Sequence, residues 1–499
     1  MGQYRNFFLL CLLVLILILG CSTLLEHRIP SLLQRPEECQ EFLNHLDEKV
    51  KEAGVRDASS YPVSGFPYLR TNRFLSSLKK NLKDHQEREQ WVRWMQQLDL
   101  ESRKKEIRNL PDELILSLAS KKVSQMDREA LFAHVEYCSC KIFNHDITRP
   151  DFYETLYPFV EVPDEYSFFR RAIGLYPFFS IPVIIATKKV RNEFKSWYKM
   201  GLDDLTIQGN LIVFAPSQEV FLYEEEVQEL VQKSKENPLG VPWLNRNEER
   251  KIAACFAPII IQDVAASYDN IGQVFWKGDR LAIDPEKPIV YYYITHALLK
   301  GKAILQINYV IWYSRRAGER SPWIERGRLD GLTVRVSLDI QGHPFMVDVM
   351  NNCGCYHFFV PKKERLDRVV SKSFRLDPFV PQWLPEITNG KHLGIRVNSG
   401  WHQVERLLAV EVSLDSILYE LVPYEVLEAL PREDGRTESM FNVKGLAKSS
   451  GKTKELLLFF SMGIPSIGSM RQRGHHAIAL TGRVHFDNPR LFERNFVLK

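Results

Sequence analysis

The sequence has no strong excess of charge of either sign. Its 66 basic and 62 acidic side chains leave a formal charge of +4 over 499 residues, so nothing marks it as a nucleic-acid-binding protein. It also has no repeat of fixed period and no low-complexity tract. With 45% hydrophobic residues, a chain of this length can bury a large core and is expected to form two or more domains.

Common catalytic signatures are missing as well. The chain has no Gly-x-Ser-x-Gly and no His-Glu-x-x-His motif, and the Gly-Lys-Thr at residues 451–453 lacks the strand and the upstream glycine of a phosphate-binding loop. One acid–base pair can be picked out near the C-terminus, where His485 polarised by Asp487 would serve as a general base. Whether the protein is an enzyme is therefore left open by its motifs.

The N-terminus contains the one long apolar run that looks like a targeting segment. A short region with Arg5 is followed by uncharged, apolar residues from Phe7 to Leu19, which is the length of a signal-peptide core and too short for a full membrane span. Residues 18–21, Ile-Leu-Gly-Cys, resemble a bacterial lipobox, in which a peptidase cuts before an acylated cysteine. The resemblance covers residues 1–21 only, and it implies a signal peptide at residues 1–20 and lipidation of Cys21.

The resemblance also implies a location. The residue after the cysteine, Ser22, is not acidic, which in Gram-negative lipoproteins implies export to the outer membrane. We therefore expect a protein of the bacterial cell envelope that is held to the membrane by its N-terminal lipid and faces the periplasm. The alternative is an uncleaved N-terminal membrane anchor, because Leu24 and Leu25 could extend the apolar run.

The remaining chain changes character near residue 205. Residues 21–205 contain apolar residues every three or four positions, which predicts a mainly helical region. Residues 206–499 contain β-branched and aromatic runs around short turns, notably at 288–314 and 331–350, which predict antiparallel hairpins. The expected fold is α+β, a helical N-terminal region followed by a larger region built on antiparallel β-sheet.

The most apolar stretch after the signal is residues 172–191. Pro177 and Pro182 are expected to interrupt a helix there, and the run is too short to cross a bilayer. We expect a buried hairpin or broken core helix. The alternative is a segment that lies on a membrane surface or docks a partner, with Lys188, Lys189 and Arg191 at its end binding the lipid headgroups.

The stretch NNCGCYHFFVP places Cys353, Cys355 and His357 at alternate positions. If the preceding strand continues through them without a bulge, they share the inward face of the sheet with its apolar residues. Polar groups at the end of an inward row indicate a pocket or polar site at the edge of the sheet. His296, on the first strand of the neighbouring hairpin, is the expected cross-strand neighbour.

A second cluster has the same chemistry. The stretch HVEYCSCKIFNHD contains His134, Cys138, Cys140 and His145, with the first two one helical turn apart. Zinc or copper would accept thiolate and imidazole ligands from either cluster. The competing interpretation is oxidation or simple burial.

The number of cysteines favours that competing interpretation. Loss of Cys11 with the signal and acylation of Cys21 would leave six of the 8 cysteines, an even number in an oxidising compartment. Disulfide, buried thiol, metal ligand and reactive cysteine are all consistent with the sequence.

Two classes of function follow. The first is a membrane-anchored envelope lipoprotein that acts as a binding or scaffold protein, with an envelope protein as a partner. The second is an envelope hydrolase or metal-dependent enzyme with a Cys/His site at the end of the C-terminal sheet.

The lipobox is tested by Cys21→Ser. Because the acyl chain is attached to the sulfur of this residue, we expect the variant to lose lipidation and to accumulate as uncleaved precursor. Metabolic labelling with a radioactive fatty acid and the electrophoretic mobility of the product measure both effects. Normal processing and normal fractionation of the variant would show that the protein is not a lipoprotein.

Overall fold

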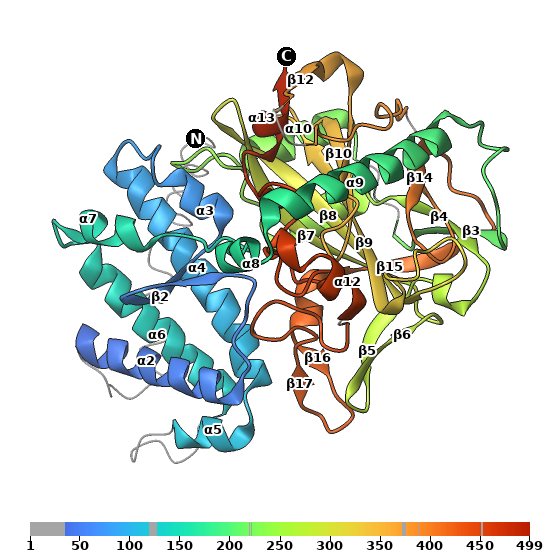
Figure 1. Cartoon of the computed structure of the whole chain (residues 1–499). Helices are drawn as coiled ribbons and strands as arrows, with labels where there is room; N and C mark the ends of the chain where they lie inside the picture. The colour runs from blue at the N-terminus through green and yellow to red at the C-terminus, as the bar shows by residue number, and fades with distance from the viewer. Residues whose placement is uncertain are drawn as a thin grey trace. The chain divides into compact units, whose positions relative to one another are not determined.

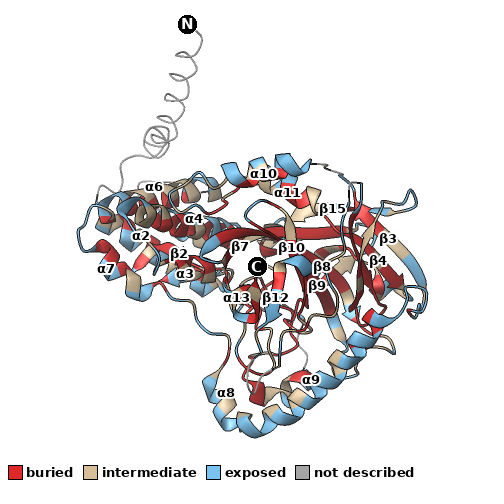
Figure 2. Ribbon diagram, turned by 90° about the horizontal axis from the view of Figure 1, so that it is seen from above, coloured by how far each residue is buried: buried red, intermediate tan, exposed pale blue. Residues whose placement is uncertain are grey.

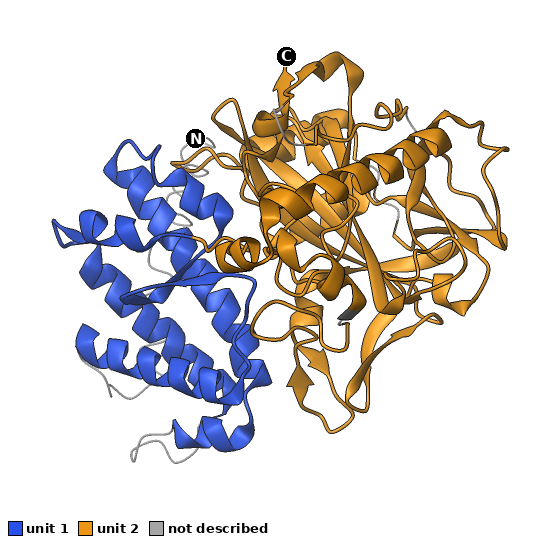
Figure 3. Cartoon of the chain, in the orientation of Figure 1, with its two compact units in different colours: residues 1–161 blue, residues 162–499 orange. Residues whose placement is uncertain are grey.

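The computed structural model describes residues 35–118, 127–218, 220, 222–371, 376–388, 390–450 and 453–499. The expected signal peptide and Cys21 lie outside these residues. The chain divides into two compact units, Met1–Glu161 and Val162–Lys499 (Figure 3). Each unit has its own core.

The described part of unit 1 is mostly helical. Its long helices begin at side chains that cap them, since Asp84 accepts a hydrogen bond from the backbone N–H of Glu87 and Asp127 accepts one from Ala130. The elements are α2 (Pro36–Ala53), β1 (Tyr61–Val63), β2 (Phe66–Thr71), α3 (Arg73–Leu78), α4 (His85–Asn109), α5 (Asp112–Ser117), α6 (Arg128–Asp146), α7 (Phe152–Leu156) and η1 (Tyr157–Phe159).

Buried ion pairs join the hairpin β1–β2 to helix α4 in unit 1. Arg70 of β2 donates to Asp99 at 3.1 Å and to Glu106 at 2.8 Å, and Arg103 pairs with Asp99 at 2.7 Å. All four side chains are almost completely buried. Charges removed from water in this way must be paired, so these contacts fix how the hairpin lies on the helix.

Unit 2 is built on a ten-stranded mixed sheet with the order β11-β10-β9-β8-β7-β15-β3-β4-β13-β14 (Figure 1). The first five strands are antiparallel, and parallel pairing enters where β15 joins β7 and β3 and where β13 joins β4. The strands of the sheet are β3 (Asn210–Pro216), β4 (Ile259–Val264), β7 (Ile289–Leu299), β8 (Lys302–Arg316), β9 (Gly327–Leu338), β10 (Pro344–Asn351), β11 (Phe358–Pro361), β13 (His392–Val397), β14 (Val404–Val410) and β15 (Ile417–Pro423).

The sheet curls, so its two edge strands approach the same helix. The Tyr198 hydroxyl of α9 donates to the carbonyl of Val404 in β14 at 2.8 Å, and its ring lies 6.0 Å from that of Phe358 in β11. The inner face of the curled sheet forms the largest apolar core of the unit. The C-terminal end of α9 therefore fills the space between the two edges.

Shorter elements cover the rest of unit 2. Helices α10 and α11 pack on the inner core, and the C-terminal segments pack on the outer face. They are α8 (Phe168–Ile173), α9 (Tyr176–Lys199), α10 (Glu224–Lys233), α11 (Arg246–Cys255), η2 (Ser267–Asp269), β5 (Gln273–Lys277), β6 (Arg280–Asp284), η3 (Lys363–Arg365), β12 (Leu366–Val369), η4 (Tyr424–Glu428), β16 (Leu430–Pro431), β17 (Thr437–Glu438), α12 (Thr453–Leu458), η5 (Phe460–Met462), α13 (Leu491–Asn495) and β18 (Phe496–Leu498).

The α+β class, with helices mostly N-terminal and strands C-terminal, is confirmed. The hairpins expected at 288–314 and 331–350 are β7–β8 and β9–β10. The division of the chain differs from the expected change at residue 205, because it follows Glu161. Helices α8 and α9 belong to the second unit, where the aromatic residues at the end of α9 pack into the sheet core.

The expectation of a buried hairpin or broken core helix at residues 172–191 is wrong. Helix α9 runs through Pro182, and its buried residues are Phe194, Trp197 and Tyr198, all near its C-terminal end. Figure 2 shows α8 and α9 as largely exposed. Among the described residues, no helix combines the length and the apolar content needed to cross a membrane.

Candidate functional site

A cavity of about 350 Å³ lies in unit 2 between α9 and the edge of the sheet. Cys353, Cys355 and His357 line it, as do the inward residues of α9 at 183, 186, 187, 190, 191 and 194. These positions recur every three or four residues and so share one face of the helix. Apolar side chains from residues 459–467 and 477–484 complete most of the wall, so the cavity is mainly hydrophobic.

The cysteines reach the cavity through a chain reversal, which corrects the expectation of a continuous strand. Strand β10 ends at Asn351, whose backbone N–H bonds the Cys355 carbonyl at 3.0 Å, and the chain returns as β11 from Phe358. Gly354 has φ +88, and an added Cβ there would lie 2.4 Å from the carbonyl oxygen of Ala477. Glycine is therefore required at this reversal for both its backbone conformation and its size.

His357 is oriented by a buried carboxylate. Its Nε2 lies 2.8 Å from Asp348 Oδ2, and Asp348 also receives two hydrogen bonds from Arg335, at 2.9 and 2.6 Å. Burial lowers the pKa of His357 below its ordinary value, although the hydrogen bond to Asp348 opposes this effect. The ring is thus held neutral, with an acceptor carboxylate that fixes its orientation.

His296 does not take the position expected for it. Its Nε2 lies 2.7 Å from the carbonyl oxygen of Pro242, and its ring stacks on Trp243 with centroids 5.7 Å apart. On β7, His296 lies on the same side of the strand as Val290 and Tyr292, which face the inner core. Asp348, the partner of His357, lies between inner-core residues of β10 and therefore faces the outer side of the sheet. The two histidines therefore belong to opposite faces of the sheet.

The thiol of Cys355 is kept in its protonated form. A hydrogen bond with Cys353 and burial together raise the pKa of Cys355 well above its ordinary value. Both residues are thiols in the structure, so a disulfide or a metal at this position stays a prediction. Among the described residues, no group of three or more His, Cys, Asp and Glu side chains is close enough together to hold a metal ion.

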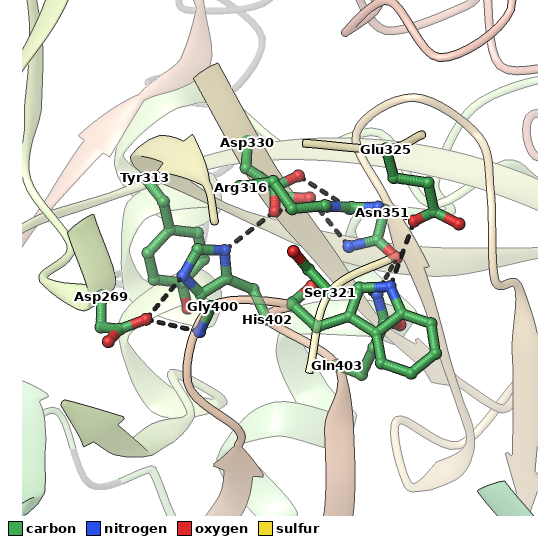
Figure 4. Close-up of polar contacts among 12 residues, drawn as sticks. Asp269, Tyr313, Arg316, Ser321, Glu325, Asp330, Asn351, Gly400, His402 and Gln403 are labelled. Carbon is green, nitrogen blue, oxygen red and sulfur yellow. Dashed lines mark hydrogen bonds and ion pairs between the residues drawn. The ribbon is translucent and has the colours of Figure 1, made fainter. Parts of the chain in front are cut away.

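A buried polar network makes contact with residues of the reversal (Figure 4). Glu325 accepts hydrogen bonds from the Tyr356 hydroxyl and, at 3.1 Å, from the indole N–H of Trp401. Its carboxylate also pairs with Arg316, which makes two further hydrogen bonds with Asp330 at 2.9 and 2.8 Å. Since Tyr356 follows β10 and Trp401 precedes β14, one carboxylate joins the turns beside the two sheet edges.

His402 extends this network between two more carboxylates. Its Nδ1 lies 2.8 Å from Asp330 and its Nε2 lies 3.1 Å from Asp269, and its ring stacks on Tyr313 at 3.8 Å. Burial lowers the pKa of His402, but the hydrogen bonds to Asp269 and Asp330 outweigh burial, so the pKa is raised above its ordinary value. None of these three groups lines the cavity, and their arrangement is that of a structural clamp.

The second Cys/His cluster only partly comes together. His134 Nε2 lies 3.9 Å from Cys138 Sγ, and Cys138 also contacts the thiol of Cys39 in α2, which raises the pKa of Cys138 together with burial. His145 instead pairs with the carboxylate of Asp146 at 3.2 Å and is half exposed. Cys140 is partly buried on the same helix. Cys39 was missed because its partner lies 99 positions away in the sequence.

His485 contacts a segment that the sequence did not suggest. Its Nε2 accepts a hydrogen bond from the backbone N–H of Glu165 at 3.3 Å and lies 3.4 Å from Asp164. Its ring packs edge-on against Tyr166 at 5.3 Å. The general-base role proposed with Asp487 stays a prediction.

Two lining residues were also missed. Thr481 is 93% buried, and its hydroxyl has no hydrogen-bond partner among the described residues. Arg191 donates to the carbonyl of Asp377 at 2.6 Å, and burial lowers the pKa of Arg191 to about 10. Thr481 stands in no motif, and the sequence groups Arg191 with the basic residues expected at a bilayer surface, so only the folded chain shows that both share the cavity with Cys355 and His357.

Comparisons with family models, with curated proteins and with solved structures give no significant match to this chain. The geometry of the site therefore carries the functional argument.

The clamp is tested by Asp330→Asn. The change leaves the Arg316 guanidinium and the His402 ring without their shared carboxylate in a fully buried position, so we expect the free energy of unfolding to fall by about 3–5 kcal/mol. Denaturant unfolding followed by tryptophan fluorescence measures it. Asp434→Asn, which removes the exposed pair with Arg436, should leave the stability nearly unchanged. A loss no larger than that of this control would contradict the role of the clamp.

His296 predicts a loss of stability in mild acid. Burial lowers the pKa of His296 to about 4, whereas an unfolded histidine titrates near 6.5, so the unfolded chain takes up a proton first as the pH falls below about 6.5. The free energy of unfolding therefore decreases progressively as the pH falls from 6.5 to 4. The free energy of unfolding of the unchanged protein should fall between pH 8 and pH 5. In His296→Phe, which has no group to protonate at this position, that fall should be smaller by about 1–2 kcal/mol. Denaturant titrations at both pH values measure this, and equal losses would contradict it.

Proposed function

We propose that the protein is a membrane-anchored lipoprotein of the bacterial envelope that binds one apolar chain with a hydrogen-bonding head, such as a fatty acid, in the cavity beneath α9. The observation that carries this proposal is the cavity itself. A volume of about 350 Å³ is at the lower end of the range of small-molecule sites, about 300–1,000 Å³, which suits a single chain.

Two polar residues of the lining suit such a ligand, in a wall that also contains the side chains of Glu325, Asp377 and Glu455. The buried hydroxyl of Thr481, which has no partner among the described residues, is available to a ligand head. Arg191 supplies a cation for a carboxylate or phosphate, because a pKa of about 10 keeps it charged at neutral pH. A few polar groups in an apolar wall are the usual composition of a ligand site.

Binding is favoured over catalysis by the state of the cysteine. The thiolate is the nucleophilic form of cysteine, and the raised pKa of Cys355 makes it scarce at neutral pH. The specific observation that favours the alternative, an envelope hydrolase, is the pairing of His357 with Asp348 in the same cavity. That arrangement resembles an oriented base, so the hydrolase is the second candidate.

The anchor and the location rest on the N-terminal sequence. A signal peptide at residues 1–20, an acylated Cys21 and an outer-membrane position facing the periplasm all follow from the lipobox resemblance. We also propose that the protein contacts a partner protein of the envelope, because a scaffold role requires such a partner.

The cavity is tested by fluorescence titration with cis-parinaric acid, a fluorescent fatty acid. We expect saturable binding by the chain that begins at Ser22, because every described element lies beyond this residue. Thr187→Trp directs a large ring into the cavity and should weaken binding at least about tenfold, which corresponds to about 1.4 kcal/mol. Asn192→Trp, on the same helix but outside the lining, should bind normally.

The two candidate functions give different results with Cys355→Ser. Under the binding function this variant retains cis-parinaric acid binding, and the protein does not hydrolyse an acyl thioester. Steady hydrolysis of a thioester by the unchanged protein, lost in Cys355→Ser and His357→Ala, would support the hydrolase instead. Equal affinity of Thr187→Trp and the unchanged protein would contradict a ligand site in the cavity.

A further inference from the structure

Helices α8 and α9 expose an unusually apolar surface. Phe168 is 75% exposed, Phe178 is 72% exposed and Ile185 is 64% exposed. A monomeric soluble protein rarely exposes large apolar side chains as one group, and such groups usually mark a binding surface. The α8–α9 face consists of Phe168, Phe169, Ile173, Leu175, Phe178, Phe179, Ile181 and Ile185, all of them exposed.

The outward side of α9 changes from apolar to basic along its length. Phe178, Ile181 and Ile185 are followed at the same helical spacing by Lys188, Lys195 and Lys199, and all six are exposed. These positions are three, four or seven residues apart, so they form one stripe of the helix. The apolar part of this stripe can enter a hydrophobic layer while the basic part stays at its polar surface.

The positive charge of unit 2 is concentrated in this segment. Residues 168–199 contain seven basic side chains and one acidic side chain, which gives a net charge of +6. Since the whole chain carries +4, all other residues together carry −2. Apolar side chains next to a basic cluster fit the surface of an anionic bilayer, where the former enter the interface and the latter bind lipid headgroups.

We propose that the α8–α9 face docks on the surface of an anionic lipid bilayer. This contact is independent of the N-terminal lipid, because it is made by a folded part of unit 2. It also does not depend on the ligand in the cavity. If the proposed function holds, the contact has a further consequence: α9 is one wall of the cavity, so docking brings the site to the lipid from which an acyl chain would come.

The test is vesicle flotation with the chain that begins at Ser22, which lacks the acylated cysteine and retains all described elements of both units. We expect it to float with vesicles of phosphatidylcholine mixed with phosphatidylglycerol, much less with phosphatidylcholine alone, and less as salt is raised. Phe178→Gln combined with Ile185→Gln should reduce the bound fraction at least about tenfold. Lys188→Glu combined with Lys189→Glu should remove the preference for anionic lipid.

A matched control replaces two exposed apolar residues elsewhere in unit 2. Leu414 and Leu418 are exposed, but Leu414 lies just before β15 and Leu418 lies in it, away from α8 and α9 in the sequence. The variant with Leu414→Gln and Leu418→Gln should therefore float as the unchanged protein does. An equal loss in this control, or no flotation of the unchanged protein with either vesicle, overturns the proposal. So does a dimer in solution that Phe178→Gln dissociates, since the face would then join two copies. Binding of cis-parinaric acid is measured without vesicles and therefore reports separately on the cavity.

Discussion

The second unit depends on the carboxylate of Glu325, which joins the two edges of the curled sheet. It accepts hydrogen bonds from Tyr356, beside the β10–β11 turn, and from Trp401, beside the β13–β14 turn, and it is paired with Arg316 of β8. An open ten-stranded sheet would expose two unpaired edges. A buried charge without partners is costly, and the partners of Glu325 come together only when the two edges of the sheet are close. The polar network therefore favours the closed arrangement of the sheet.

Closure of the sheet also explains why α9 is buried at its C-terminal end and exposed toward its N-terminal end. Phe194 and Trp197 pack against Trp401, with ring centroids 5.5 and 5.8 Å apart, so the C-terminal part of the helix is fixed to the closed edges. The N-terminal part extends beyond them and has apolar residues both toward the cavity and outward. A helix that is apolar on all sides is normally buried. The N-terminal part of α9 is exposed among the described residues. In the proposed docking, a lipid surface removes its apolar side chains from water, as a protein core otherwise would.

The sequence predicts best those features that depend on neighbouring residues. Runs of β-branched and aromatic residues around short turns were enough to predict β7–β8 and β9–β10. It failed at the reversal, because the positive φ angles of Gly354 and Tyr356 turn the chain back and cancel the parity assigned to His357. It could not find the His402 clamp, since Asp269 lies 133 positions from its partner. The spacing in 172–191 shows which α9 residues share a face but not what covers that face.

The reversal nevertheless brought Cys353, Cys355 and His357 into one cavity, and it changed what they can do there. In a continuous strand they would have shared a face with Asn351, whereas Asn351 instead accepts a hydrogen bond from Gln403 and helps to join the sheet edges. Cys355 stays a thiol, and the lowered pKa of His357 keeps its ring neutral at neutral pH. Arg191 is then the only lysine or arginine among the described lining residues. A ligand with an apolar chain and an anionic head would therefore place that head at Arg191 and leave the cysteines against its uncharged part.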